Sequence, residues 1–380
     1  MLKYNSVVKN KNSKGSDMMR ILISGGGTGG HIYPALALVK AFQAIDSSVE
    51  VLYVGSEKGL EKDIVTRAGY DFKSIEISGF RRSLSFENIK TIQRFLTAVS
   101  TSKKYIKDFN PDVVIGTGGY VCGPVVYAAA RLKKPTIIHE QNSLPGVTNK
   151  FLARYVDKVA ICFEEARTYF PQSKVVLTGN PRASEVVKTP RIGKAALGLN
   201  PKKQTIMIAG GSRGAEPINN AIIDLIDTLE AAPYEVVFVT GAKHYEEIAD
   251  KVKAHDLKNV KVMPFINNMP SYLVHTDLFI GRSGATFLSE VTALGVPSIL
   301  IPSPYVTANH QEYNARSITD HQGGTLILEK ELTAAGLMEA IDSIMLDEKR
   351  RQTMQQVAKQ LGVPDAANRL ISLTNEIIKN

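Results

Sequence analysis

A histidine and a glutamate follow glycine-rich turns in opposite halves of this chain, and their side chains are well suited to chemistry. His31 comes directly after Gly30. An imidazole with an ordinary pKa of about 6.5 can accept a proton near neutral pH, so His31 is a candidate general base; the alternative is a histidine that only supports the loop. Glu290 follows the turn 281–285. A carboxylate can accept two hydrogen bonds from a ribose diol, or it can merely complement a helix dipole.

Three glycine-rich turns of similar design occur along the chain, at 25–30, 116–119 and 210–215. Each follows a short apolar run typical of a buried strand and precedes a segment that can be helical. Glycine permits positive φ and close approach to a ligand, and a helix beginning just beyond offers free N–H groups and a positive dipole end. The pattern therefore predicts phosphate binding, with Ser212 and the amides around it as candidates and Arg213 adding charge nearby.

Further polar side chains follow the strands of the first half. Tyr120 ends the second glycine turn, and the run 139–142 (His-Glu-Gln-Asn) emerges directly from the apolar run 136–138. Ligands of open parallel sheets bind at the carboxyl ends of the strands. The run 139–142 is therefore either part of a binding site or a structural hydrogen-bonding network.

Two other site classes are disfavoured. The turn 25–30 satisfies the dinucleotide spacing G-x-G-x-x-G, but a nicotinamide site also needs an acid at the end of the second strand, and here Glu57 comes late. The spacings of His, Cys and Asp suggest neither a zinc site nor a carboxylate metal site. Negative charge leaving on a diphosphate would then be stabilised by helix N-termini and an arginine such as Arg282.

Length and composition bound the organisation of the chain. A chain of 380 residues is expected to form two domains, and its net charge of +9 favours anionic partners such as nucleotide phosphates or an acidic membrane surface. The two cysteines, Cys122 and Cys162, make a disulfide framework improbable and suggest a cytosolic protein. The polar residues 1–18 are expected to be a disordered extension. The uncharged stretch 113–130 contains glycines and a proline and reads as strand, turn and helix.

Apolar runs of strand length alternate with helix-length amphipathic stretches through both halves, which predicts an α/β protein with parallel sheets. A Gly-Asn-Pro break at 179–181 places the domain boundary there, so the expected domains are 19–180 and 181–363. Helical patterning continues from 332 and is interrupted at 362–364, so the last helix, 364–380, is expected to cross back to the first domain. The expected strands are 21–24, 49–54, 112–115, 136–139, 175–178, 205–209, 235–240, 260–263, 277–280, 298–301 and 325–328.

Taken jointly and in order, these motifs resemble the MurG family of bacterial glycosyltransferases, glycosyltransferase family 28. The resemblance runs from about Met19 to the C-terminus. It is carried by the runs 26–34, 118–121, 139–142, 179–181, 210–215, 264–266, 282–285 and 289–290.

The resemblance implies a GT-B fold, in which two Rossmann-like parallel-sheet domains face each other across a cleft. It implies inverting transfer of GlcNAc from UDP-GlcNAc to the 4-hydroxyl of MurNAc in an undecaprenyl-pyrophosphoryl-MurNAc-pentapeptide, with no cofactor, metal or nucleic acid involved. The implied donor contacts are Ile266 for the uracil, Ser212 for the phosphate region, Glu290 for the ribose, Gln311 for the sugar, with Thr28, Gly29, Gly30, Asn142, Arg182, Arg282, Ala285, Thr286, Phe287, Leu288 and Ser289 as the other substrate-binding residues. His31 is the implied base, and Gly119, Tyr120 and Glu140 are expected on the acceptor side.

Two departures from the family pattern concern phosphate contacts. Some members carry an arginine two residues after Gly-Asn-Pro, whereas here Arg182 follows Pro181 directly and Ala183 comes next. The Gly-Gly-Ser motif is often followed by glutamine, and here it is followed by Arg213.

A basic and apolar segment in the first half is the candidate membrane contact. The residues expected to meet the inner leaflet of the cytoplasmic membrane are Arg81, Arg82, Leu84 and Phe86. The apolar stripe of 89–96 either extends this surface or belongs to the core. The alternatives to a peripheral membrane glycosyltransferase are a UDP-GlcNAc 2-epimerase of related fold and a noncatalytic nucleotide-binding protein.

Overall fold

The first half of the chain forms a parallel sheet. The computed structural model describes residues 18–77, 87–211 and 213–379, with the side chains of 87–90 left out. The strands of this sheet lie in the order β3-β2-β1-β4-β5-β6-β7, and every described pair is parallel. Their bounds are β1 (Arg20–Gly25), β2 (Glu50–Ser56), β3 (Asp71–Ile75), β4 (Val113–Gly118), β5 (Thr136–Glu140), β6 (Lys158–Ile161) and β7 (Val175–Leu177).

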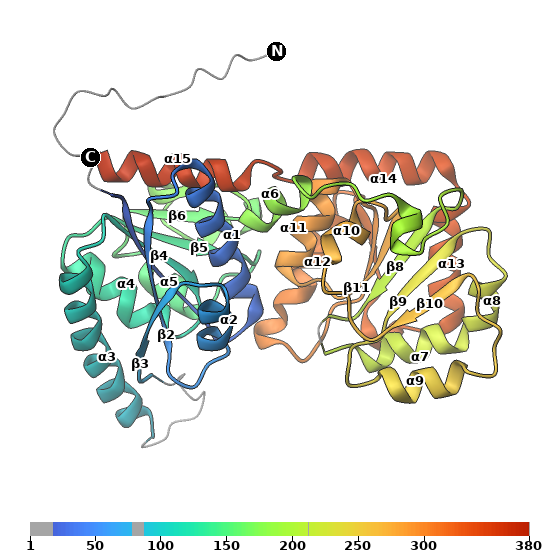
Figure 1. Ribbon diagram of the computed structural model, residues 1–380, viewed down its shortest axis with the longest axis horizontal. Coiled ribbons are helices and arrows are strands. Elements are labelled where there is room, and N and C mark those ends of the chain that lie inside the picture. The colour runs from blue at the N-terminus through green and yellow to red at the C-terminus, as the bar shows by residue number, and fades with distance from the viewer. Residues whose placement is uncertain (1–17, 78–86, 212, 380) are drawn as a thin grey trace, which may run out of the picture.

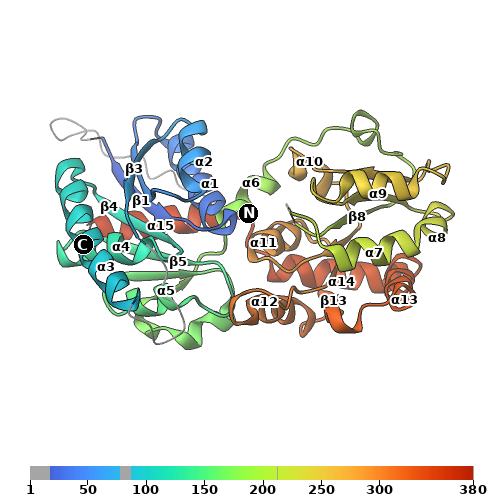
Figure 2. The same ribbon diagram turned by 90° about the horizontal axis from the view of Figure 1, so that it is seen from below.

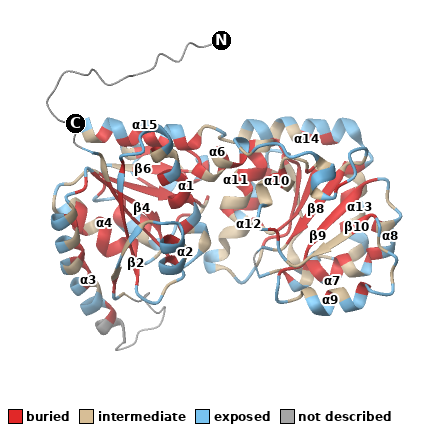
Figure 3. Cartoon of the chain, viewed as in Figure 1, coloured by how far each residue is buried: buried red, intermediate tan, exposed pale blue. Residues whose placement is uncertain are grey.

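Helices cover both faces of this first sheet. Along β1, Leu22 packs toward α3 and α4, whereas Ile21 and Ile23 pack toward α1. A strand buried on both faces reads as a continuous apolar run rather than an alternating one. Figure 3 shows the strands largely buried and the helices exposed on their outer sides. The helices of this half are α1 (Gly29–Ile45), α2 (Glu61–Arg67), α3 (Glu87–Phe109), α4 (Cys122–Arg131) and α5 (Val147–Leu152).

The second half repeats the design with a sheet of order β10-β9-β8-β11-β12-β13, again parallel throughout. Its strands are β8 (Thr205–Ala209), β9 (Glu235–Val239), β10 (Val260–Met263), β11 (Leu278–Gly281), β12 (Ser298–Leu300) and β13 (Gly324–Leu326). Its helices are α7 (Glu216–Asp224), α8 (Ile226–Glu230), α9 (Tyr245–Val252), α10 (Met269–Leu273), α11 (Ala285–Leu294), α12 (His310–Thr319), α13 (Ala334–Met345) and α14 (Glu348–Leu361). The two parallel sheets confirm the predicted α/β class.

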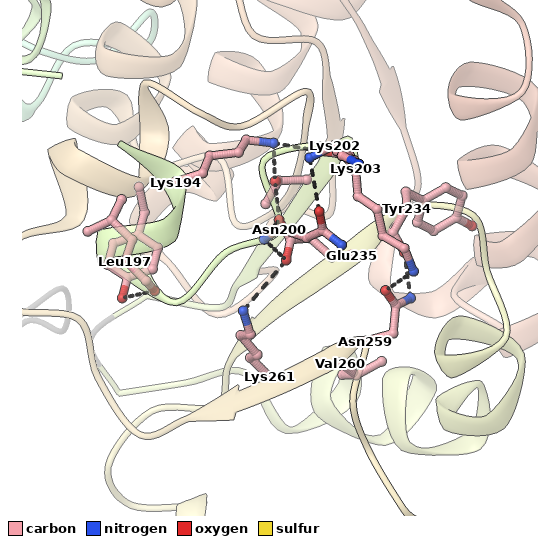
Figure 4. Close-up of polar contacts among 12 residues, drawn as sticks. Lys194, Leu197, Asn200, Lys202, Lys203, Tyr234, Glu235, Asn259, Val260 and Lys261 are labelled. Atoms are coloured by element: carbon pink, nitrogen blue, oxygen red, sulfur yellow. Dashed lines mark hydrogen bonds and ion pairs between the residues drawn. The ribbon is translucent and has the colours of Figure 1, made fainter. Parts of the chain in front are cut away.

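A polar network holds the amino ends of the strands in the second sheet (Figure 4). The Glu235 carboxylate is buried and accepts from the Asn200 amide at 2.9 and 3.0 Å and from Thr205 Oγ1 at 3.0 Å. Lys261 Nζ lies 3.6 Å from the same carboxylate, and Lys194 donates to Thr205 Oγ1. A buried carboxylate needs such partners because its desolvation is otherwise costly. The network stabilises the amino ends of the strands, and the glycine turns follow the carboxyl ends.

A short helix, α6 (Pro181–Val187), lies at the junction of the two halves (Figures 1 and 2). Asn180 caps it by accepting the Arg182 amide at 3.0 Å, and Pro181 occupies the first turn, where a missing N–H costs nothing. The helix packs against α11 of the second half and against α1 of the first. The predicted break at 179–181 is thus the start of the element that contacts both halves.

The last helix, α15 (Ala366–Lys379), crosses back to the first sheet (Figure 1). Leu370, Ile371, Leu373 and Ile377 belong to the apolar cluster that contains β1 and α1. Ser184 of α6 fastens the crossing, because its hydroxyl donates to the Pro364 carbonyl at 2.9 Å and accepts the Ala367 amide at 3.0 Å. We therefore propose to divide the chain into domains 19–180 and 181–363, with 364–380 packed on the first. Nearly all of the expected extension 1–18 lies outside the described residues.

The stretch 113–130 consists of β4 followed by α4, as predicted. Within the described parts of the chain, helices with the length and apolarity to cross a bilayer are not found. Two strands were missed by the sequence pattern, β3 and β6. The first is short and half exposed, so it lacks the continuous apolar run of its neighbours, whereas the second has an apolar run after Lys158 that the sequence reading overlooked.

Replacing Ser184 by alanine is expected to destabilise the junction. The substitution leaves the buried Ala367 N–H without its acceptor, which costs about 1–3 kcal/mol of the free energy of unfolding. Urea unfolding followed by circular dichroism measures the change. The matched control is Ser343→Ala, whose half-buried hydroxyl only donates to a carbonyl of its own helix and should change stability by less than about 0.5 kcal/mol. Equal midpoints for the two variants would contradict the role of Ser184.

Candidate functional site

Two glycine turns of the first domain lie in direct backbone contact. The Gly26 amide donates to the Gly118 carbonyl at 3.2 Å, and a Cβ on Gly119 would stand 2.3 Å from the Gly26 carbonyl oxygen. Gly119 also has a φ of +84°, a conformation that favours glycine. The neighbouring Tyr120 is partly exposed, and its ring lies beside Gly27. The predicted acceptor-side residues Gly119 and Tyr120 therefore adjoin the first turn.

His31 lies in the first turn of α1, with Thr28 at the N-cap and Gly29 and Gly30 between them. Its Nδ1 is 2.8 Å from the Gly26 carbonyl and 3.3 Å from Thr28 Oγ1. A carbonyl only accepts, so Nδ1 carries the proton, and in the neutral ring Nε2 keeps a free lone pair. Burial lowers the pKa of His31 below its ordinary 6.5, which corrects the unperturbed value assumed from the sequence. The ring is therefore neutral at physiological pH and can accept a proton at Nε2.

Glu61, which the sequence pattern did not single out, braces the first glycine turn. Its carboxylate is fully buried and accepts the Ser56 amide at 2.7 Å, the Ser56 hydroxyl and, at 3.4 Å, the Gly27 amide. A Cβ on Gly26 would stand 2.5 Å from this carboxylate. In sequence, Glu61 is an acidic residue at the start of a helix, which the helix dipole alone explains. Only its burial against the turn shows what it supports.

The run 139–142 forms a buried hydrogen-bond network at the end of β5. Gln141 Nε2 donates to the Thr117 carbonyl at 2.7 Å and to His139 Nδ1 at 2.9 Å. Burial lowers the pKa of His139 to about 4, so this histidine is neutral. Glu140 is also buried and accepts from Asn142 Nδ2 at 3.2 Å and Asn149 Nδ2 at 2.9 Å. Of the two alternatives for this run, a binding site or a structural hydrogen-bonding network, His139, Glu140 and Gln141 form the network in this structure.

Asn142 connects the two domains. Its Oδ1 accepts from Nδ2 of Asn314, a buried residue of α12, at 3.1 Å. Asn314 Oδ1 accepts in turn from the Ser143 amide at 2.9 Å and the Ser143 hydroxyl at 3.0 Å. His310, at the start of α12, lies close enough to His31 to lower the pKa of that ring further through electrostatic repulsion. These contacts bring the carboxyl edges of the two sheets together, and neither Asn314 nor His310 was predicted.

The turn between β11 and α11 leads directly into the N-terminus of a helix, the feature from which the sequence predicts phosphate binding. The helix begins at Ala285, so its first amides point out of the helix end. Thr286 Oγ1 is buried and has no hydrogen-bond partner among the described residues, whereas the Ser289 hydroxyl donates to the Ala285 carbonyl at 2.8 Å. Leu288 and Phe287 face the protein interior, the latter with its ring 4.4 Å from that of Phe279. Thr286 is thus the side chain of this turn with unused hydrogen-bonding capacity.

Arg282, Gln311 and Ile266 lie on or near this edge, but each already has protein contacts. Arg282 donates to the Ile301 carbonyl at 3.0 Å and forms an ion pair with Glu329. Gln311 Oε1 accepts the Ser303 amide at 3.0 Å. Ile266 is buried in the apolar cluster of the second domain. The charge of Arg282 is therefore balanced by a carboxylate that the sequence did not associate with it.

Arg182 reaches Glu290. Arg182 Nε and Nη2 lie 2.8 and 2.6 Å from Glu290 Oε1, and Nη1 contacts Glu185. The two partners are well shielded, with 19% of the Arg182 side chain and 5% of the Glu290 side chain exposed. Burial raises the pKa of Glu290, and the nearby arginine opposes that rise. In this structure Arg182 therefore contacts Glu290, the residue expected to bind the ribose, in place of the expected phosphate.

Several predicted site residues lie outside the described residues, namely Ser212 and the membrane candidates Arg81, Arg82, Leu84 and Phe86. Among the residues that are described, no group of three or more His, Cys, Asp and Glu side chains is placed to hold a metal ion. A cavity of about 200 Å³ lies at the junction, lined by residues of both domains that include Cys162 and Asn180. Of the candidate site residues, Ser289 of α11 lines this cavity, whereas His31 and Glu290 do not.

Two family models match most of the chain. Residues 21–161 match the glycosyltransferase family 28 N-terminal domain, and residues 205–370 match the glycosyltransferase family 28 C-terminal domain. A relative from Bacillus cereus is 57% identical over 95% of this chain and 100% of its own length, and one from Bacillus pumilus is 58% identical over 94% and 99%. Both relatives are named UDP-N-acetylglucosamine--N-acetylmuramyl-(pentapeptide) pyrophosphoryl-undecaprenol N-acetylglucosamine transferases.

Solved structures agree with this assignment. The crystal structure of Acinetobacter baumannii MurG matches with a TM-score of 0.76 and 28% sequence identity. The match covers 94% of this chain and 99% of that one. A UDP-GlcNAc 2-epimerase from Neisseria meningitidis shares the fold, with a TM-score of 0.66 and 14% sequence identity. That match covers 95% of this chain and 100% of the epimerase chain. The two parallel-sheet domains are thus those of the GT-B fold, and the chain belongs to glycosyltransferase family 28.

Proposed function

We propose that this enzyme transfers GlcNAc from UDP-GlcNAc to the 4-hydroxyl of MurNAc in undecaprenyl-pyrophosphoryl-MurNAc-pentapeptide, converting lipid I to lipid II in peptidoglycan synthesis. The relatives that match nearly the whole chain are named for this transfer. The observation that carries the proposal is a bridge between the strand ends of the two domains: Asn314 Nδ2 donates both to Asn142 Oδ1 of the first domain and to the Ser283 carbonyl, which lies in the turn before α11. A transferase needs a base and a leaving-group site on facing edges of one cleft.

The second domain is proposed to bind the donor. The diphosphate would lie on the amides of 285–288, with the buried Thr286 hydroxyl as a further donor. Glu290 would accept the ribose hydroxyls, Gln311 would contact the sugar and Ile266 the uracil. The positive end of α11 would then stabilise the charge that develops on the departing UDP. Ser212 and Arg282 remain candidates for the phosphate region.

The first domain is proposed to supply the base. As the MurNAc 4-hydroxyl attacks the anomeric carbon, His31 Nε2 takes its proton, the bond to the UDP oxygen breaks and UDP leaves. One displacement inverts the anomeric centre and gives the β-linkage. The Nδ1–H of His31, held by the Gly26 carbonyl, orients the ring and stabilises the imidazolium that forms. Gly119 and Tyr120 would line the acceptor side, and Glu140 would act through Asn142, whose amide it accepts.

A face of the first domain is proposed to dock on the cytoplasmic side of the membrane. The side chains of Ile92 and Leu96 on α3 are 52% and 63% exposed, so they belong to the surface rather than to the core. Next to them, the ring of Phe95 packs on that of Phe151 of α5, with 6.2 Å between the ring centroids. The centroids of the Phe151 and Tyr155 rings are 5.3 Å apart. An apolar and aromatic surface of this kind can enter the headgroup region of a bilayer. We name Ile92, Leu96, Phe151 and Tyr155 the α3–α5 patch.

The direct test incubates the purified enzyme with radiolabelled UDP-GlcNAc and a short-chain prenyl-pyrophosphoryl-MurNAc-pentapeptide, with and without EDTA. A labelled disaccharide lipid is expected in both samples, because the α11 amides supply the electrostatic stabilisation that the reaction needs. Failure to form it, with N-acetylmannosamine released from the nucleotide sugar alone, would instead identify an epimerase.

Replacing His31 by alanine is expected to lower kcat by about 10²- to 10⁴-fold, the usual contribution of a general base. In the wild type, kcat/KM should fall only below pH 6.5, because protonation through a lowered pKa removes the base form. Initial rates of disaccharide-lipid formation across pH 5–8 measure both effects. His255→Ala, at a surface histidine paired with Asp227 in the second domain, is the control and should leave the rate unchanged. Nearly full turnover in His31→Ala would move the role of base to another group.

Replacing Ile92 and Leu96 together by glutamate is expected to reduce binding to vesicles of anionic phospholipid by at least about tenfold, since charge and polarity replace the apolar contact. Vesicle co-sedimentation measures the binding, and turnover of a water-soluble acceptor analogue checks that the fold is intact. Leu346→Glu is the matched control, because Leu346 is also 63% exposed but lies in the second domain. Unchanged vesicle binding by the double variant would exclude the α3–α5 patch as the docking surface.

A further inference from the structure

Four charged side chains contact one another in series, from Lys40 in the first domain to Glu290, the residue proposed to bind the ribose. Lys40 Nζ on α1 lies 3.5 Å from Glu185 Oε1, and the other oxygen of Glu185 contacts Arg182 Nη1. The remaining nitrogens of Arg182, Nε and Nη2, both contact Glu290 Oε1. The sequence of contacts therefore runs from α1 through α6 to α11. We call Lys40, Glu185, Arg182 and Glu290 the junction charge chain.

The exposed fractions of these side chains fall along the junction charge chain. They are 61% for Lys40, 34% for Glu185, 19% for Arg182 and 5% for Glu290. A carboxylate as buried as that of Glu290 favours its protonated form unless a cation stands beside it. Arg182 is that cation. Burial lowers the pKa of Arg182, but the carboxylates of Glu290 and Glu185 raise it by more. The charge on Glu290 thus depends on Arg182.

The position of Arg182 is fixed by its helix as well as by its ion pairs. Its amide donates to Asn180 Oδ1 at the N-cap, so the residue is held in the first turn of α6. The helix itself is wedged among α1, α11 and α15. With the backbone held and three guanidinium nitrogens engaged, the carboxylate of Glu290 has a defined orientation.

We propose that Arg182 is a positioning residue for the donor nucleotide: it keeps Glu290 ionised and oriented for the ribose hydroxyls and, through Glu185, ties that site to α1 of the acceptor domain. The inference rests on the proposed function, in which Glu290 accepts the ribose hydroxyls. It gives Arg182 a role other than the phosphate contact suggested by the family pattern. A protonated or misoriented Glu290 would accept hydrogen bonds from a diol poorly.

The test compares two donors, UDP-GlcNAc and its 2′-deoxyribose analogue, with the full-length wild type, Arg182→Ala and Arg182→Lys. For the wild type, removing the hydroxyl should lower kcat/KM by at least about tenfold, the factor that one charge-assisted hydrogen bond provides. In Arg182→Ala, the KM for UDP-GlcNAc should rise about tenfold or more, kcat should change less, and the preference for the ribose donor should shrink toward none. Arg182→Lys restores the charge without the fork and should recover part of the preference.

The outcomes separate this inference from the function on which it rests. A wild type that makes lipid II but does not prefer the ribose donor removes the ribose role of Glu290 and, with it, the inference. A preference fully retained in Arg182→Ala overturns the inference and leaves the proposed function standing. A lower KM in Arg182→Ala also overturns it, because Arg182 would then compete with the ribose for Glu290.

Two further variants guard against a structural explanation. Arg369→Ala removes an exposed ion pair between Arg369 of α15 and Asp365, which precedes that helix, and should leave both KM and donor preference unchanged. Should Arg182→Ala prove unstable, Arg182→Gln carries the same comparison, because glutamine keeps much of the length and a hydrogen-bond donor but not the charge. A stable Arg182→Gln with wild-type donor preference would contradict the proposal as firmly as the alanine variant.

Discussion

Burial of opposite charges at the domain junction is the constraint on which the arrangement of this enzyme depends. Glu290 is almost entirely shielded from water, and Arg182 is largely shielded, so neither charge could remain there without the other. Arg182 lies on α6, the first helix beyond the proposed domain boundary, and Glu290 lies on α11, the helix whose N-terminus is the proposed phosphate site. The pair therefore fixes how α6 lies on α11, and α6 in turn contacts α1 and α15. The junction and the proposed donor site therefore share α11.

The first domain meets a different constraint, the close approach of backbone to backbone. Gly119 lies against the Gly26 carbonyl, where no side chain would fit. Because the two turns touch, the Gly26 carbonyl is held where it can accept from Nδ1 of His31. Glu61 braces the same turn from the other side. The tautomer of the proposed base thus follows from the packing of two glycine turns against a buried carboxylate.

A third set of contacts, hydrogen bonds made by neutral residues, joins the two domains across the cleft. Asn314 contacts both Asn142 and Ser143, and all three lie at carboxyl ends of strands or in the elements that follow them. Such bonds are individually modest and are exchanged readily for water. They therefore suit a contact between domains that must admit a donor and a lipid acceptor, whereas the buried ion pair suits the permanent junction.

The sequence by itself determined the α/β class, the two parallel sheets and the family, because apolar runs, glycine turns and the Gly-Asn-Pro break are local features whose spacing the chain carries directly. It also named His31 and Glu290 as candidates for chemistry. The sequence reading missed β3, whose short, partly polar run carries little signal, and overlooked the apolar run of β6. Only the tertiary structure decided that Arg182 meets Glu290, that Arg282 meets Glu329 and that Glu61 braces a glycine turn. These partners are far apart in sequence or look like ordinary helix-start acids, and burial, which creates their need for one another, exists only once the chain has folded.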